Sequence, residues 1–262
     1  MSYMIKFIKM SAQGNDYIYL DRTKNVYHEL NFSELAIKIS DRNFGIGSDG
    51  LVIIDNSDVA DAALRIFNSD GSEAAMCGSA IRSAVAYLLK SINFSKESLS
   101  LETLSGIKYG FMKDRSDLNV SVDMGKVEII GNYEVYGRQG SKISVGNLHF
   151  VVYSENPAED CLKNGQLFSS YFKDGINVEF IKIINENEIE MSVWERGSGI
   201  TLACGTGSCA VFIKAFKDGK ADSSVKINVP GGTVYCRYDK NTGNVYLEGD
   251  VKIIASGEYF WE

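Results

Sequence analysis

Two cysteines, Cys77 and Cys204, stand in closely similar sequence surroundings. Each is followed by a glycine, a hydroxyl residue and a small residue, and then by an apolar stretch that favours a helix. A cysteine directly before a helix lies where unpaired backbone N–H groups and the positive end of the helix dipole meet. This position favours the thiolate and attracts a carboxylate. The pair therefore indicates proton transfer by thiols beside a bound carboxylate.

Two such helix starts in one cleft could place a sulfur on each side of a Cα atom. One thiolate would remove the α-proton while the other sulfur, as a thiol, supplied a proton to the opposite face, which inverts the centre. Gly78 and Gly205 would let the backbone approach the ligand closely, and Ser79 and Thr206 could turn hydroxyls toward the same carboxylate. We expect this chemistry to need no cofactor.

The alternative is that these cysteines are small buried residues at helix starts, which is the usual role of an isolated cysteine. We assign that role to Cys161, Cys209 and Cys236. A redox sensor that joins Cys77 to Cys204 as a disulfide is also compatible with an enzyme, as its inactive oxidised form.

Metal binding is not expected. The chain has five cysteines without a CxxC pair, and its only histidines are His28 and His149. A zinc site would have to use thiolates, and Cys204 with Cys209 has no second ligand pair to complete it. The odd number of cysteines and their loose spacing instead favour free thiols in a reducing compartment.

Composition excludes several classes of partner. The net charge of −7 and the pI near 5.1 leave no basic surface for a phosphate backbone, so we predict no nucleic-acid partner. No stretch approaches the roughly 18 apolar residues of a membrane span, and residues 1–10 have no cleavage pattern. We therefore expect a cytoplasmic protein that does not contact membranes. At 262 residues it could form one large domain or two smaller ones.

The elements that must position the cysteines are short strands with a few helices. Alternating or β-branched runs between turn residues predict strands at 5–9, 17–21, 51–55, 62–68, 177–184 and 188–194, with strand and turn throughout 225–260. Helices are predicted at 32–40, after Cys77, from Pro157 behind an Asn156 cap, and after Cys204. The two helices that follow the cysteines are apolar nearly all round and must be buried on most sides. Two related halves, each a sheet wrapped on a helix, account for this pattern.

Longer motifs identify a family. The chain resembles diaminopimelate epimerases nearly end to end, through motifs at residues 7–10 with 14–16, 41–42 with 45–50, 65–73 leading to 76–78, 194–199 with 201–207, and 230–232. The resemblance implies an α/β (α+β) fold of two similar halves, each a barrel-like sheet around a central helix, related by a pseudo-two-fold axis. The first half would take residues 1–120 and a returning strand at 251–262, and the second residues 121–250.

The resemblance also implies the reaction and its residues. The chain would be an isomerase that interconverts LL- and meso-diaminopimelate, without pyridoxal phosphate or metal. A homodimer is left open as its assembly. Cys77 and Cys204 would be the acid/base pair, with His149 assisting Cys77 and Glu195 assisting Cys204. The residues expected to bind the small-molecule amino-acid substrate are Asn15, Asn68, Gly78, Ser79, Asn147, Asn177, Glu195, Arg196, Gly205 and Thr206.

These roles agree with simple recognition chemistry. A bidentate arginine suits a second carboxylate, and a glutamate with several asparagine amides suits a second ammonium. The other readings are a packed structural histidine at position 149, a turn residue at Asn15 and a solvated surface pair at Glu195-Arg196.

Three departures from the family pattern bear on the substrate. Ser79-Ala80 stands where Asn-Gly is usual, Leu148 where proline is usual and Ser11 where histidine is usual. Ala80 lacks the easy left-handed backbone of glycine, and Ser79 lacks an amide. A racemase of the same architecture for histidine, lanthionine or hydroxyproline is therefore the runner-up. A binding protein that has lost the chemistry is disfavoured because both sulfurs are present.

Overall fold

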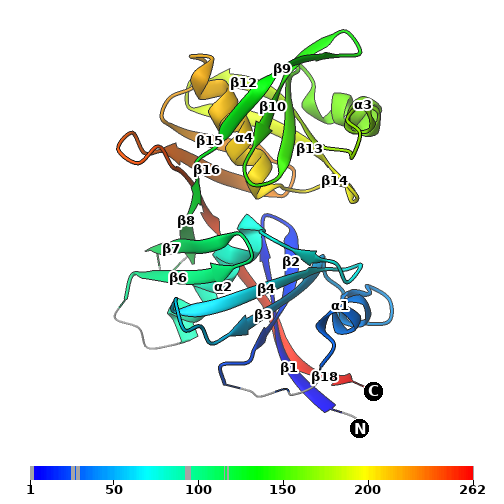
Figure 1. Ribbon diagram of the computed structural model, residues 1–262, viewed down its shortest axis with the longest axis vertical. Helices are drawn as coiled ribbons and strands as arrows, with labels where there is room; N and C mark the ends of the chain where they lie inside the picture. The colour runs from blue at the N-terminus through cyan, green and yellow to red at the C-terminus, as the bar shows by residue number, and fades with distance from the viewer. Residues whose placement is uncertain are drawn as a thin grey trace. The chain divides into compact units, whose positions relative to one another are not determined.

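The computed structural model describes residues 3–24, 27, 30–91, 96–114, 116 and 118–261. The chain divides into two compact units. Figure 1 labels their helices and strands and colours the chain by residue number. Unit 1 consists of Met1–Val122 with Asp250–Glu262, and unit 2 of Asp123–Gly249. No helix in the described part of the chain is long and apolar enough to cross a membrane.

The strands of unit 1 pair in the order β18–β1–β2–β3–β4–β6–β7–β8. Neighbouring strands are antiparallel except for the parallel pairs β2–β3 and β4–β6. A short β5 also pairs with β4. The bounds are β1 (Tyr3–Ala12), β2 (Asn15–Asp21), β3 (Gly50–Asp55), β4 (Ala62–Asn68), β5 (Glu73–Ala74), β6 (Ser98–Thr103), β7 (Gly106–Asp114), β8 (Asn119–Gly125) and β18 (Lys252–Trp261).

The strands of unit 2 pair in the order β9–β10–β11–β12–β13–β15–β16–β17. Only β11–β12 and β13–β15 are parallel. A short β14 pairs with β13. The bounds are β9 (Glu128–Val135), β10 (Arg138–Ser144), β11 (Leu148–Tyr153), β12 (Asn177–Asn185), β13 (Glu188–Glu195), β14 (Gly199–Thr201), β15 (Ser224–Val229), β16 (Gly232–Tyr238) and β17 (Val245–Asp250).

The two units therefore repeat one topology. Reading along each sheet gives the same succession of antiparallel and parallel pairs, with β18 matching β9 and β8 matching β17. In each unit one helix connects the strands of the first parallel pair and a second helix connects those of the other. The prediction of a mixed α/β fold with two similar halves is confirmed.

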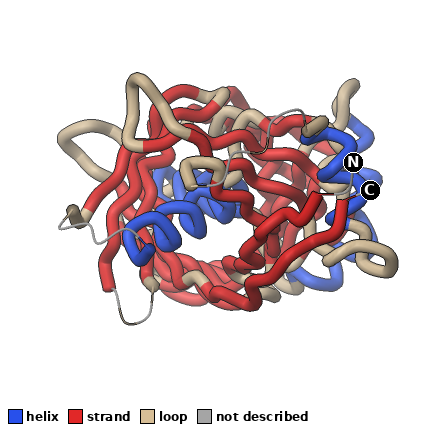
Figure 2. The backbone as a smooth tube through the Cα atoms, turned by 90° about the horizontal axis from the view of Figure 1, so that it is seen from below, coloured by secondary structure: helices blue, strands red, loops and turns tan. Residues whose placement is uncertain are grey.

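A buried helix runs inside the curved sheet of each unit. In unit 1, α2 (Gly78–Ser91) contacts β1, β2, β6 and β7, which are far apart in the order of the sheet. In unit 2, α4 (Gly205–Lys217) contacts strands from β10 to β13 and also β16. Figure 2 shows red strands curving around blue helices. Burial on all sides explains why both sequences are apolar nearly all round.

The other two helices pack on the sheets with one face only. The first, α1 (Phe32–Ser40), buries Leu35, Ala36 and Ile39, and its Asn31 cap accepts a hydrogen bond from the Glu34 N–H. The second, α3 (Pro157–Tyr171), begins at the predicted proline. The predicted Asn156 cap is wrong in one respect, because its side chain makes no cap hydrogen bond. Ser154 accepts from the Asn156 N–H instead.

Close packing of β10 gives a stability prediction. A Cβ atom at Gly140 would lie 2.4 Å from Cζ of Phe150, which is fully buried. We expect Gly140→Ala to lower the free energy of unfolding by about 1–3 kcal/mol, measured by urea denaturation. The control is Gly131→Ala in β9, where the new Cβ would meet only the Tyr133 ring at 3.5 Å. Equal effects of the two substitutions would show that Phe150 does not limit the space at Gly140.

Candidate active site

Cys77 lies at the start of α2 in unit 1, as the sequence predicted. The Ile81 N–H donates to the Cys77 carbonyl at 3.0 Å, so the cysteine occupies the residue before the helix. Cys77 is half-buried, and its sulfur accepts a hydrogen bond from Nδ2 of Asn15 at 3.8 Å. The predicted residues Asn15 and Cys77 are thereby brought together from β2 and α2.

Tyr17 is a neighbour of Cys77 that sequence reasoning missed. Burial raises the pKa of the Tyr17 phenol well above its usual value, and the charge and hydrogen bonding of Cys77 raise it further. The phenol therefore stays protonated and can donate to the sulfur. Its position in β2, two residues after Asn15 on the same face of the strand, was the available signal.

Cys204 caps α4 in unit 2. The residue has an extended backbone with φ −131°, and its sulfur accepts the Gly207 N–H at 3.4 Å. The Ser208 N–H donates to the Cys204 carbonyl at 2.9 Å, which repeats the arrangement of Ile81 and Cys77. The helix start at each cysteine thus follows the same local pattern.

The surroundings of Cys204 favour the neutral thiol. Burial raises the pKa of Cys204 well above its usual value, and the negative charges of Glu195 and Glu179 raise it further. Hydrogen bonds from Thr206 and the Gly207 N–H act in the opposite direction and are weaker influences. Cys204 is therefore suited to donate a proton.

Glu195 lies beside Cys204, as predicted. Burial raises the pKa of its carboxyl, and hydrogen bonds with Thr201 and Cys204 lower it. Thr201 donates a short hydrogen bond to Oε1 of Glu195. This carboxyl is within reach of the sulfur and can hold or release a proton near it.

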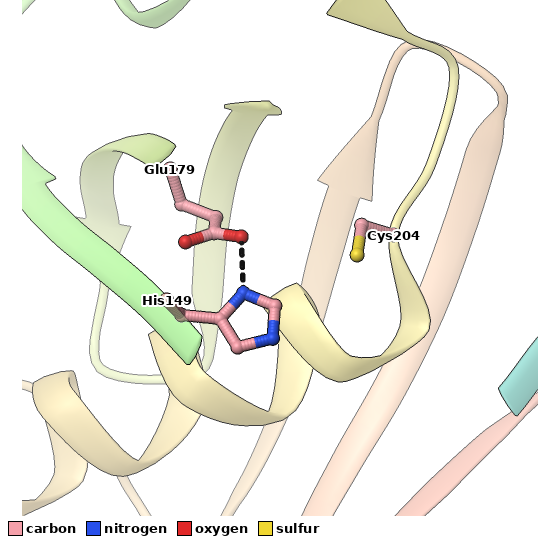
Figure 3. Close-up of side chains that lie close together, drawn as sticks. All are labelled: His149, Glu179 and Cys204. Atoms are coloured by element: carbon pink, nitrogen blue, oxygen red, sulfur yellow. Dashed lines mark hydrogen bonds and ion pairs between the residues drawn. The ribbon is translucent and has the colours of Figure 1, made fainter. Parts of the chain in front are cut away.

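His149 lies in the same cluster as Cys204. Its Nδ1 contacts Oε1 of Glu179 at 2.6 Å, and its Nε2 contacts Oδ1 of Asn147 at 3.0 Å. One donor atom from each of His149, Glu179 and Cys204 lies within 4.8 Å of the others, and Figure 3 shows the three side chains. Within unit 2 the sulfur in this group is that of Cys204. The expected assistance of His149 to Cys77, which belongs to unit 1, stays a prediction.

Glu179 is the second residue that sequence reasoning missed. Its side chain is fully buried in β12, and a Cβ atom at Gly207 would lie 2.6 Å from its Oε1. The glycine lets the first turn of α4 approach this carboxylate. The signal in the sequence was a single acidic residue between Val178 and Phe180 in an otherwise apolar run, because buried carboxylates are rare without a partner.

Asn177 positions Arg196 through the backbone. Its Oδ1 accepts the Arg196 N–H at 2.9 Å, and its Nδ2 donates to the Leu148 carbonyl at 3.2 Å. Both ends of the amide are therefore bonded within the protein. The Arg196 side chain is exposed, and its guanidinium makes a 3.5 Å contact with the Asp174 carbonyl.

In unit 1, Ser79-Ala80 stands where the family usually has Asn-Gly, and this difference does not strain the backbone. Both residues are buried in the first turn of α2, and neither has a positive φ. A left-handed conformation is not used there, so alanine is a suitable residue. Asn68, at the end of β4, donates through Nδ2 to Oγ of Ser72 at 2.9 Å.

The structure gathers the remaining predicted residues by unit. In unit 1 the first turn of α2 presents the backbone N–H groups of Gly78 and Ser79 next to Cys77. In unit 2 the start of α4 similarly presents Gly205 and Thr206. Four more predicted residues come from the ends of β11, β12 and β13 or just beyond them: Asn147, Asn177, Glu195 and Arg196.

One group of donor atoms within the described residues has the composition of a metal site, namely that of His149, Glu179 and Cys204. The imidazole and the carboxylate in this group bond directly to each other. Such a pair holds a proton without a metal ion. A metal-free site stays a prediction.

Comparison with known proteins places this arrangement in one family. The profile of the family described as Diaminopimelate epimerase matches residues 7–130 and 141–254. A diaminopimelate epimerase of Parabacteroides distasonis is 39% identical, with 98% of each chain covered. That of Bacteroides thetaiotaomicron is 40% identical, with 98% of this chain and 99% of its own covered. That of Methanococcus maripaludis strain C6 is 39% identical, with 97% of this chain and 99% of its own covered.

Solved structures share the fold at low sequence identity. A phenazine biosynthesis protein of the PhzF family from Bacillus anthracis has a TM-score of 0.74 at 16% identity, with 98% of this chain and 99% of its own covered. A hydroxyproline epimerase from Agrobacterium vitis has a TM-score of 0.69 at 13% identity, with 98% of this chain and 92% of its own covered. These likenesses show the architecture alone.

Proposed function

The chain belongs to the diaminopimelate epimerase family, and from this premise we propose that it interconverts LL- and meso-diaminopimelate by proton transfer at Cα. The observation that carries the proposal is the repetition of one thiol setting in both units. Cys77 and Cys204 each precede a buried central helix, at matching places in the topology. Two thiols of this kind, one for each face, can invert a carbon centre by removing a proton on one side and supplying one on the other.

In the proposed reaction one sulfur serves each face of the reacting Cα. One cysteine takes the α-proton as a thiolate, while the other delivers its S–H proton to the opposite face. The reverse reaction exchanges these roles. The backbone N–H groups at the starts of α2 and α4 would hold the carboxylate of the reacting end and stabilise the charge that develops there. No electron acceptor is required, so the proposal includes no cofactor.

The choice of a two-headed substrate depends on Arg196, Glu195 and the asparagine amides. Arg196 has an exposed guanidinium whose backbone is fixed by Asn177. A guanidinium is suited to bind a carboxylate with two parallel hydrogen bonds. Glu195 and the amide of Asn147 would then receive an ammonium. A substrate with one amino-acid head would leave these groups unmatched.

We expect the protein to act in the cytoplasm, where cysteines stay reduced. The proposal is tested by incubating reduced protein with a panel of single-enantiomer amino acids in deuterated water. Chiral chromatography and NMR would follow inversion and deuterium uptake at Cα. We expect LL-diaminopimelate to be converted to the meso form, with chelator and hydroxylamine having no effect. A higher specificity constant for histidine or another single-headed amino acid would replace this proposal with the related racemase.

A further inference from the structure

Tyr17 and His149 occupy matching places in the two units. Strands β2 and β11 are each third in their sheet, and each follows a hairpin turn whose glycine has a positive φ, Gly14 in one unit and Gly146 in the other. An asparagine follows each glycine, and the third residue after each glycine is Tyr17 or His149. Each of the two also forms the first pairing of a parallel ladder, β2–β3 or β11–β12. The repeat of the fold therefore makes Tyr17 the counterpart of His149.

Each of these two side chains lies near the cysteine of its own unit. In unit 2, donor atoms of His149 and Cys204 belong to one group whose members lie within 4.8 Å of one another. In unit 1, the Tyr17 phenol hydrogen-bonds with Cys77. Unit 1 thus places a phenol beside its sulfur where unit 2 places an imidazole.

The inner face of β2 follows the first turn of α2. Asn15, Tyr17 and Tyr19 alternate along the strand and share one face. Nδ2 of Asn15 lies 3.8 Å from the Cys77 sulfur, and the Tyr19 hydroxyl donates to the Ala80 carbonyl at 3.2 Å. Tyr17 stands between these two contacts, so its ring faces the end of the helix that carries Cys77.

Packing fixes the position of the Tyr17 ring. The residue is only 6% exposed, and a Cβ atom at Gly50 in the neighbouring strand β3 would lie 2.8 Å from its Cε1. The hydroxyl therefore cannot turn outward to exchange its partner for bulk water. A donor held in this way is already in place before any proton moves.

The chemistry of the two groups sets the direction of the hydrogen bond. Burial, then the charge and hydrogen bonding of Cys77, raises the pKa of the Tyr17 phenol, so this group keeps its proton. A phenol O–H is a strong donor and a thiol S–H a weak one, so the O–H points to the sulfur. Such a bond is stronger when its acceptor is charged, and it stabilises a thiolate more than a thiol. Further ionisable groups near this contact are Tyr19 and Asp16 in β2, Asp49 before β3 and Arg82 in α2.

We propose that Tyr17 is a further catalytic residue, whose hydroxyl donates a hydrogen bond to the Cys77 sulfur and stabilises the thiolate that removes the α-proton. The inference rests on the proposed role of Cys77 in proton transfer at Cα. Tyr17 keeps its own O–H throughout, and the proton that Cys77 gains comes from the substrate. The two sulfurs of the site thus have chemically different partners.

The test is the pH dependence of Cys77 alkylation in Tyr17→Phe, which keeps the ring and removes only the hydroxyl. Reduced, substrate-free protein would be treated with iodoacetamide over a range of pH, and the Cys77 peptide quantified by mass spectrometry. We expect the midpoint of the rate profile to rise by about one pH unit, a tenfold loss of acidity. The midpoint is decisive because a less stabilised thiolate is also a stronger nucleophile, which partly offsets the rate at a single pH.

The matched control is Tyr19→Phe, which removes a hydroxyl from the same face of β2 that is bonded to the Ala80 carbonyl. In this variant the Cys77 midpoint should stay unchanged. If the phenol oxygen instead accepted the S–H of Cys77, Tyr17→Phe would lower the midpoint. A lower or unchanged midpoint in Tyr17→Phe, or an equal rise in Tyr19→Phe, overturns the proposal.

A second measurement keeps the proposal open to refutation if Tyr17→Phe does not fold. The unaltered protein would be labelled with ¹³C at Cζ of tyrosine and followed by NMR against pH. We expect one phenol resonance to shift over the pH range in which Cys77 becomes reactive, to keep the value of a protonated phenol, and to stay fixed in Cys77→Ser. Absence of such a resonance, or loss of the phenol proton over this range, contradicts the proposal. Neither measurement includes substrate, so its failure and a failure to convert diaminopimelate would be seen separately.

Discussion

Cys77→Ser and Cys204→Ser are each expected to lower kcat/KM for diaminopimelate epimerisation by about 10²–10⁴-fold, the range for loss of a general acid or base. A serine hydroxyl is a far weaker acid than a thiol and cannot exchange a proton with Cα at a useful rate. Since each sulfur serves one face, neither can replace the other. The measurement is the initial rate of conversion, with binding of the substrate followed separately by calorimetry.

Retained folding is part of this expected result. Circular dichroism and the thermal midpoint should stay close to those of the unaltered protein, because oxygen replaces sulfur without a change of shape. Cys236→Ser in β16 is the matched control, since Cys236 is buried in the sheet and has no role in the proposed reaction. Full activity in either active-site variant would end the two-thiol account, as would an equal loss in Cys236→Ser.

Arg196→Met is expected to weaken the binding of diaminopimelate by roughly 2–5 kcal/mol, the usual effect of removing one partner of a desolvated charge pair. The methionine keeps an unbranched apolar chain but leaves the distal carboxylate without a cation. KM should rise by about thirtyfold or more. Since the arginine is proposed to contact the end remote from the reacting Cα, kcat should fall less than kcat/KM.

Arg237→Met is the control for the Arg196 experiment. Arg237 belongs to the same unit, in β16, and stacks over the Tyr246 ring at 4.4 Å, away from the proposed substrate contacts. The Arg237→Met substitution should leave the KM for diaminopimelate unchanged. An unchanged KM in Arg196→Met would remove the reason for assigning a two-headed substrate, even if the two-thiol reaction itself were intact.

Local signals explain what the sequence predicted well. The helices that follow Cys77 and Cys204 were recognisable because a glycine, a hydroxyl residue and a long apolar run are contiguous. Helix α3 was recognisable from Pro157, whose fixed φ suits the first helical position. The prediction that the Asn156 side chain caps this helix was wrong, because capping depends on a side-chain rotamer that residue type does not determine.

The partners of these residues depend on strand register, which cannot be predicted from the residue types alone. β11 and β12 are parallel, with His149 paired to Asn177, and this register carries Glu179 to the imidazole from 30 positions along the chain. Tyr17 likewise reaches Cys77 only because β2 lies against α2. A one-residue shift of either strand would turn these side chains to the opposite face.

The position of β18 has a consequence for how the chain folds as it is synthesised. β1 pairs with β18 from Tyr3 to Ser11, yet β18 follows the whole of unit 2 in the chain. A ribosome therefore releases the continuous unit 2 before unit 1 can complete its sheet. Until then this side of β1 is an open edge, able to recruit a strand from another nascent chain. Such a protein depends on the late pairing of β18, and a nascent chain stalled before residue 252 would expose the edge of β1 to aggregation.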